Sequence, residues 1–347
     1  MQLKNGWIAT VAGLAAITLA GCNNGGNNGG NNTQSGDNAS TSGSSGANGG
    51  QAEATSLRIG FNPTIAQPQP LLGAANGEYA AQMKDTKFTF SSYKAGPAVV
   101  EVLRSGVIDI GCSGIYPPLK GFAKDGDIVL LAGAAKGGTE LMVAKASPFK
   151  TLQDLKGKTI GVNQLGSTVD TTVRNKLLEA GLSPDRDVKI IPVDPAEQAD
   201  VLKSGDVQAI AAPAPWPSVA VVNADARPLL DWKTILDNGN YLAGSFYTTK
   251  KFAQANPQLL KRFIAANAAI TDRLNRDRAK GDAQVLAAWS KISKKKLSPE
   301  VARAAFKTIQ YTLDARPEDL QRFADMAFKV GALKKKADLI DFVFQAP

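Results

Sequence analysis

Short apolar runs recur along the chain from residue 57 onward, and most are followed by a segment with helix signals. Each run is about five residues long, and many are bounded by Gly, Pro or Asn, which is typical of buried strands. Strands that alternate with helices favour parallel pairing, so the pattern predicts an α/β fold with a parallel sheet. The expected strands span 57–61, 87–93, 107–111, 128–132, 141–144, 159–162, 189–193 and 207–211.

Proline and glycine mark the ends of the expected helices. Pro97 opens a helix that Gly106 ends, and Gly181 ends a helix that begins at 166–168. The order of strands and helices restarts after the fourth strand, which predicts two α/β lobes with a ligand between them. Beyond Phe246 the chain is predicted to be helical, with apolar residues at helical spacing: Leu259, Phe263, Ala266, Ile270 and Leu274.

The first 56 residues differ from this pattern. An apolar run at 7–19 is too short for a membrane-spanning helix, which needs ~20 residues, and fits a secretory signal. It ends in Leu-Ala-Gly-Cys22, which resembles the lipobox of bacterial lipoproteins. Residues 1–21 are therefore expected to be a signal peptide, and Cys22 to carry a membrane-anchoring lipid. An ordinary cleaved signal with an incidental Cys is the alternative. Residues 22–56 are predicted to be a disordered Gly/Asn/Ser linker.

Composition excludes several kinds of chemistry. The chain has no His, so His-based catalysis and His-ligated metal sites are excluded. Cys22 and Cys112 are the only two Cys, which excludes zinc ribbons, iron–sulfur clusters and a disulfide framework. We interpret Cys112 as a small buried hydrophobe. There is no Walker-type phosphate-binding motif either. The sequence therefore predicts a protein that is not an enzyme and uses no cofactor or metal.

The net charge of +9 does not indicate nucleic acid, because the chain has no Arg-rich arm and is expected to be exported. Lysines cluster at 294–296 and 334–336, near the ends of expected helices. We interpret both clusters as solvated surface, where cations at helix C-termini are favourable. Contact with an anionic membrane or a partner is the alternative.

Several segments, in order, resemble the substrate-binding proteins of ABC transporters. Residues 101–118, EVLRSGVIDIGCSGIYPP, are similar to the family stretch EAL-x-x-G-x-ID-x-G-x-x-G-x-x-P. Segments 154–158, 163–167, 310–316 and 328–333 continue the similarity. The resemblance is to the aliphatic sulfonate, taurine and nitrate branch, which is related to thiamine-precursor-binding proteins.

This resemblance implies a type II periplasmic-binding-protein fold. Two lobes, each a mixed and mostly parallel sheet flanked by helices, are joined by two crossing strands that act as a hinge. Lobe 1 is expected at 57–140, lobe 2 at 141–245, and residues 246–347 are expected to return to lobe 1 with the C-terminal helices. The return of the tail is implied by the resemblance alone.

The resemblance also implies a function. The chain is expected to be the extracytoplasmic solute-binding component of an ABC importer and to act as a monomer. It would capture a small organic anion, most closely an aliphatic or aryl sulfonate, and deliver it to an ABC permease driven by a separate ATPase. A nitrate-binding or thiamine/pyrimidine-precursor-binding protein and a ligand-sensing lipoprotein stay open. Pyrimidine-synthase relatives of the fold use His, which this chain lacks.

Helix N-termini beyond the carboxyl ends of strands are the expected anion site. Ser167 and Thr168 match a family anion site, although an N-cap pair is the alternative. Besides ligand contact, Ser113-Gly114 could be only a tight strand-to-helix turn and Gly138-Thr139 only a loop. For Tyr93, ordinary packing is the alternative to ligand contact. The candidate ligand-binding residues are Thr64, Gln67, Tyr93, Ser113, Gly114, Ile115, Gly138, Thr139, Gly166, Ser167, Thr168 and Trp216.

Trp216 marks a departure from the family pattern. The chain reads Pro215-Trp216-Pro217 where many relatives read Trp-Glu-Pro or Trp-Asp-Pro. Loss of the acid removes a partner for a ligand amine and a repulsion for an anion. A plain or aromatic anion is therefore favoured over a taurine-like zwitterion. Trp216 is expected to stack on the ligand or to cap the cleft, with interlobe packing as the alternative.

Overall fold

The computed structural model describes residues 53–345. The expected signal peptide, the lipidation site Cys22 and nearly all of the expected linker lie outside the described residues and stay predictions. Within 53–345, none of the helices combines the length and the apolar character needed to cross a bilayer.

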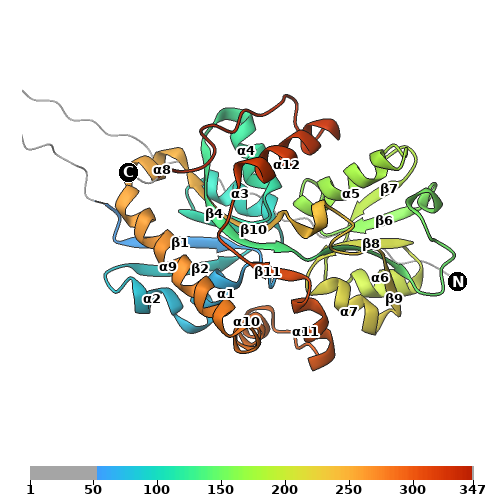
Figure 1. Ribbon diagram of the computed structural model, residues 1–347, viewed down its shortest axis with the longest axis horizontal. Helices are drawn as coiled ribbons and strands as arrows, with labels where there is room; N and C mark the ends of the chain where they lie inside the picture. Colours follow the sequence, from blue (N-terminus) through green and yellow to red (C-terminus); the bar gives the residue numbers. More distant parts are fainter. Residues whose placement is uncertain (1–52, 346–347) are drawn as a thin grey trace, which may run out of the picture. The chain divides into compact units, whose positions relative to one another are not determined.

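Two mixed sheets form the framework (Figure 1). The first has the order β11-β4-β10-β3-β1-β2 and the second the order β7-β6-β8-β5-β9. β10 and β11 run antiparallel to their neighbours in the first sheet, and β5 does so in the second, while the other pairs are parallel. The predicted α/β fold with mixed sheets is therefore confirmed.

The strands of the first sheet are β1 (Ser56–Phe61), β2 (Lys87–Ser92), β3 (Ile110–Ser113), β4 (Ile128–Gly137), β10 (Leu242–Thr249) and β11 (Ile309–Tyr311). Those of the second sheet are β5 (Thr139–Ala144), β6 (Thr159–Val162), β7 (Lys189–Pro192), β8 (Ala209–Pro213) and β9 (Ala226–Leu230).

Helices flank both sheets (Figure 1). They are α1 (Pro68–Asn76), α2 (Glu78–Gln82), α3 (Gly96–Arg104), α4 (Tyr116–Asp125), α5 (Thr168–Glu179), α6 (Gln198–Ser204), α7 (Trp216–Asn223), α8 (Lys250–Ala255), α9 (Pro257–Arg276), α10 (Arg278–Ser293), α11 (Pro299–Phe306) and α12 (Pro317–Lys329), with short 3-10 helices η1 (Leu152–Leu155) and η2 (Asp237–Gly239). The apolar residues predicted for α9 all face the core of the first sheet: Leu259, Phe263, Ala266, Ile270 and Leu274.

The chain passes between the sheets twice. β4 continues into β5 through Gly137 and Gly138, both at φ +83°, a backbone conformation that favours glycine. A Cβ at Gly137 would also lie 2.4 Å from the carbonyl oxygen of Thr308, so no larger residue fits. The second passage leads from β9 into β10. These two connections occupy the place of the expected hinge.

The C-terminal tail contacts both lobes. β11 pairs with β4 in the first sheet, and α12 packs on α4. By contrast, α11 packs against α7, which flanks the second sheet (Figure 1). The tail therefore joins the first sheet and also borders the second lobe.

Several element boundaries differ from the prediction, and two of the differences have a clear physical reason. The chain is not helical from Phe246, because β10 runs through it to Thr249 between β3 and β4. β3 begins at Ile110 rather than at 107. The carboxylate of Asp109, just before it, instead pairs with Arg58 at 2.6 Å.

Candidate functional site

A small cavity of about 30 Å³ lies where α3, α4 and α5 begin. α3 and α4 pack on the first sheet, whereas α5 packs on the second, so the cavity lies between the lobes. Helix N-termini offer unpaired N–H groups and partial positive charge, which suits an anion. The cavity is lined by Asn62, Gly96, Gly114, Pro117, Thr139, Asn163, Ser167, Thr168, Val169, Pro213 and Ala243.

Four backbone N–H groups belong to residues that line this cavity and are left unpaired. Those of Gly96, Gly114, Thr168 and Val169 make no hydrogen bond within residues 53–345. Gly96, Thr168 and Val169 are buried residues in the first turns of α3 and α5, where N–H groups have no partner within the helix. An oxyanion in the cavity would satisfy these donors.

The two lobes touch directly beside the cavity. The backbone N–H of Tyr116, at the start of α4, donates to the Oγ1 of Thr168, at the start of α5, over 3.0 Å. A Cβ on Gly114 would lie 2.4 Å from that Oγ1, so the close approach requires glycine. Lys94 and Asp194 form a second, solvent-exposed link at 3.8 Å.

Ser167 combines the two roles considered for it. Its hydroxyl accepts from the N–H of Asp170 over 3.2 Å, which makes it the N-cap of α5. It also donates to the Oδ1 of Asn163 over 2.8 Å, and both residues line the cavity. Gly166 lies outside the lining, because its N–H turns to the Oδ2 of Asp170 over 2.8 Å. Burial raises the pKa of that carboxyl, while the Gly166 N–H and Arg174 act in the opposite direction.

Asn62 was not among the predicted site residues. It follows β1 directly and lines this cavity and the one beside it. Its side chain is 7% exposed, and its Oδ1 is buried without a hydrogen-bond partner. Rotation about the last side-chain bond would present its NH₂ group to a ligand. In the sequence, Asn62-Pro63 indicated only the end of a strand.

A larger cavity of about 260 Å³ adjoins the first and shares Asn62, Asn163 and Pro213 with it. The two cavities together are called the cleft. Three predicted residues, Thr64, Tyr93 and Trp216, line it. The Trp216 ring packs edge-on against Trp289, with 5.8 Å between the ring centroids. Trp216 therefore takes part in interlobe packing and also lines the larger cavity. The remaining lining includes Pro63, Ser92, Lys94, Asp194, Pro195, Ala196, Ser293 and Lys295.

Four of the predicted residues lie behind the cavity walls. The Gln67 amide accepts from the Thr64 hydroxyl over 2.5 Å and donates to the carbonyl of Ala243 over 3.1 Å. Ser113 is fully buried, with its hydroxyl 2.8 Å from that of Tyr247. Ile115 packs in the core and Gly138 forms the passage between the sheets. These residues support the lining without contributing to it.

Thr139 lies at the point where the passage meets the cleft. It lines the small cavity, and its N–H donates to the Tyr241 hydroxyl over 2.9 Å. The next residue, Glu140, accepts from the N–H of Trp232 over 3.3 Å. Burial is the main cause that raises the pKa of Glu140 to about 7.

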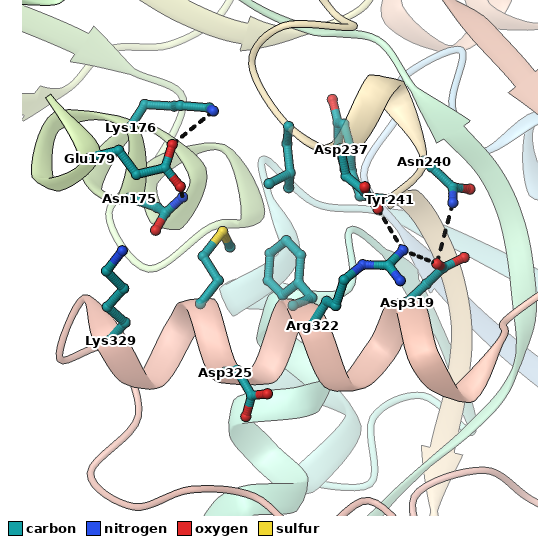
Figure 2. A pocket seen from close by; sticks show the side chains of 13 residues that line it. Asn175, Lys176, Glu179, Asp237, Asn240, Tyr241, Asp319, Arg322, Asp325 and Lys329 are labelled. Carbon is teal, nitrogen blue, oxygen red and sulfur yellow. Dashed lines mark hydrogen bonds and ion pairs between the residues drawn. The ribbon is translucent and has the colours of Figure 1, made fainter.

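A wider groove of about 430 Å³ lies between α5 and α12 (Figure 2). Most of its charged groups pair with one another, whereas Asp325 and Lys329 form no ion pair among residues 53–345. Arg322 contacts Asp319 and lies 2.7 Å from Asp237, and Lys176 lies 2.8 Å from Glu179. The flanks and C-terminal turns of these helices border most of it, so the groove does not gather unpaired N–H groups from several helix N-termini as the small cavity does. The groove is larger than the cleft, but the unpaired N–H donors favour the cleft as the binding site.

The neutral donors of the small cavity are of the kind that suit an anion. Within the described residues there is no group of three or more side chains that could ligate a metal. The donors of the small cavity are neutral backbone and side-chain groups. Lys94 and Lys295 line the larger cavity and not the small one.

Comparison with known proteins agrees with this geometry. The model of the NMT1-like family matches residues 50–290. The chain belongs to the NMT1-like family. A relative in Escherichia coli K12, named for binding aliphatic sulfonates, is 32% identical over 172 residues; the match covers 49% of this chain and about half (53%) of that relative. A Bacillus subtilis 168 relative named in the same way is 26% identical over 313 residues, covering 87% of this chain and 89% of its own length.

Solved structures related to this NMT1-like protein have the same fold. The alkanesulfonate-binding protein SsuA of Xanthomonas axonopodis pv. citri, bound to MOPS, has a TM-score of 0.70 and 25% identity, covering 85% of this chain and 100% of its own. The nitrate-binding protein NrtA of Synechocystis PCC 6803 has a TM-score of 0.66 and 17% identity, covering 82% and 84%. The predicted resemblance to the sulfonate branch is confirmed. The relatives described here are named as binding proteins, in line with a chain that is not an enzyme.

Proposed function

We propose that this protein is the solute-binding component of an ABC importer and captures a small organic sulfonate between its lobes. The observation that carries the proposal is the set of four unpaired N–H groups on one small cavity. A sulfonate presents three oxygens that can share such donors. Each charge-assisted hydrogen bond would contribute about 1.5–3 kcal/mol, so no cationic side chain is required at the head group.

The larger cavity favours an organic anion over nitrate. It adds about 260 Å³, lined in part by Tyr93 and Trp216, beside the space for the head group. Asp194 also lines it, but this carboxylate is paired with Lys94. A ligand amine would therefore find no free acid, which supports a plain or aryl sulfonate over a zwitterion.

A panel of ligands tests this assignment. Melting temperature of the purified protein would be measured with alkyl sulfonates, aryl sulfonates, nitrate and pyrimidine precursors. At 100 times the dissociation constant a ligand adds ~2.7 kcal/mol of stability, which gives a measurable shift. We expect sulfonates to stabilise the protein. A shift with nitrate or a pyrimidine, and none with any sulfonate, would overturn the ligand assignment.

We also propose that Cys22 carries the lipid that keeps the protein on the extracytoplasmic face of the membrane. The support is the Leu-Ala-Gly-Cys22 motif behind an apolar run. In cells that express the gene, Cys22→Ser should move the protein from the membrane fraction to the soluble exported fraction and abolish labelling with a fatty-acid analogue. Continued labelling of the variant would place the lipid elsewhere.

A further inference from the structure

The larger cavity of the cleft has an unbalanced charge. Lys94, Lys295 and Asp194 line it, and they are the only charged residues among its described lining. Lys94 lies 3.8 Å from Asp194, so these two charges offset one another. Lys295 has no carboxylate within ion-pair distance among residues 53–345. One positive charge is therefore left at this end of the cleft.

Local structure places Lys295 beside an aromatic wall. α10 ends at Ser293, and Lys294 reverses the chain in the left-handed conformation, φ 59°. The N–H of Lys295 then donates to the Ser293 hydroxyl over 3.3 Å. Its ammonium lies 6.0 Å from the centre of the Trp216 ring, at the outer limit of a cation–π contact. The lysine cluster interpreted from the sequence as solvated surface thus contributes one member to the cleft.

We infer that the ligand is a sulfonate with a second anionic group, and that Lys295 is the residue that selects for this group. The inference rests on the proposed function. The sulfonate head would occupy the small cavity with its unpaired N–H groups. The body would lie along Trp216, and the second acid, a carboxylate or another sulfonate, would face Lys295.

The size of the site limits the body of such a ligand. The two cavities have volumes of about 30 and 260 Å³, near the lower end of the ~300–1,000 Å³ typical of small-molecule sites. A single ring or a short alkyl chain between the two acidic groups would fill this space. Lys295 is exposed, so its contribution is that of a surface ion pair, up to about fivefold in affinity.

Two matched ligand pairs test the inference by titration calorimetry on the purified protein at low salt. The aryl pair is the dianion 4-sulfobenzoate and the monoanion 4-carbamoylbenzenesulfonate, in which an uncharged amide replaces the carboxylate. The alkyl pair is 3-sulfopropanoate and propane-1-sulfonate. We expect the dianionic member of at least one pair to bind about three- to fivefold more tightly. The preference should shrink at 0.5 M salt because exposed charges are screened.

Lys295→Met should remove this preference while the monoanionic members bind as before. Lys296→Met, at an exposed neighbour outside the cavity lining, is the matched control and should keep it, as should Lys295→Arg. Equal affinity of both members in both pairs, or a preference that survives Lys295→Met, would overturn the inference and leave sulfonate binding intact. If none of the four ligands binds, the proposed function itself fails.

Discussion

The cleft and the groove between α5 and α12 both lie between elements of the two lobes. They differ in how many of their polar groups remain without a hydrogen-bond or ion-pair partner within the described residues. The groove is the larger of the two, about 430 Å³, and most of its charges form ion pairs within it. The small cavity of the cleft is about 30 Å³, and four N–H groups of its lining residues are unpaired. A ligand gains more from the second kind of surface, because a buried donor without a partner costs about 1–3 kcal/mol until something accepts from it.

The largest effect is expected from a negative charge at the start of α5. Ser167→Glu should lower sulfonate affinity more than 100-fold, because a carboxylate would repel the ligand and occupy the donors that should hold it. Titration calorimetry gives the affinity and circular dichroism the fold. Ser167→Ala is the control: it removes the N-cap, at about 1 kcal/mol of stability, without adding charge. Affinity retained by Ser167→Glu would show that α5 does not face the ligand.

Asn62 offers a smaller change at the opposite wall of the same cavity. Asn62→Asp keeps the shape but replaces the NH₂ group with an ionised oxygen, so sulfonate affinity should fall at least tenfold. Asn62→Ala, which removes the group without adding charge, should lose less. The ratio of the two dissociation constants is the measurement. If both variants bind like the unchanged protein, Asn62 is only part of the wall.

Glu140 adjoins the boundary of the two regions, since it follows Thr139, whose N–H is held by Tyr241 of the groove. Its folded pKa, about 7, lies above its ordinary value of 4.5. The folded state therefore gains stability from protonated Glu140 below pH 4.5 and loses it as the pH rises through 7. Glu140→Gln should remove this loss. The free energy of unfolding should then rise by about 1–2 kcal/mol at pH 8 and change little at pH 4.5. Urea unfolding at both pH values measures it; a gain of equal size at both would rule out titration as the cause.

The smallest effect on binding is expected in the groove. Arg322→Met should leave sulfonate affinity unchanged, because the arginine faces Asp237 and Asp319 rather than the cleft (Figure 2). Stability should fall by about 1 kcal/mol in urea unfolding, since Asp319 keeps Lys136 and Arg316 as partners. A clear loss of affinity would make the groove part of the binding site.

The sequence predicted the repeated α/β pattern and the N-terminus of α5, because both depend on local signals such as Ser167 and Gly181. It did not predict β10, whose place between β3 and β4 depends on contacts more than 100 residues away in the chain. Asn62 was missed for a similar reason. Its importance comes from sharing a cavity with Asn163 and Thr168, and nothing beside it in the chain indicates that neighbourhood.

The hydrogen bond from Tyr116 to Thr168 joins the lobes without involving cargo. In the proposed function, any closed form would gain this bond with or without ligand, so closure would be partly independent of the ligand. A permease that recognised only the closed conformation would then also bind ligand-free molecules. These would compete with ligand-bound molecules for its extracytoplasmic face. Under this proposal, the ligand would have to contribute enough additional free energy of closure that ligand-bound closed molecules outnumber ligand-free ones at the permease.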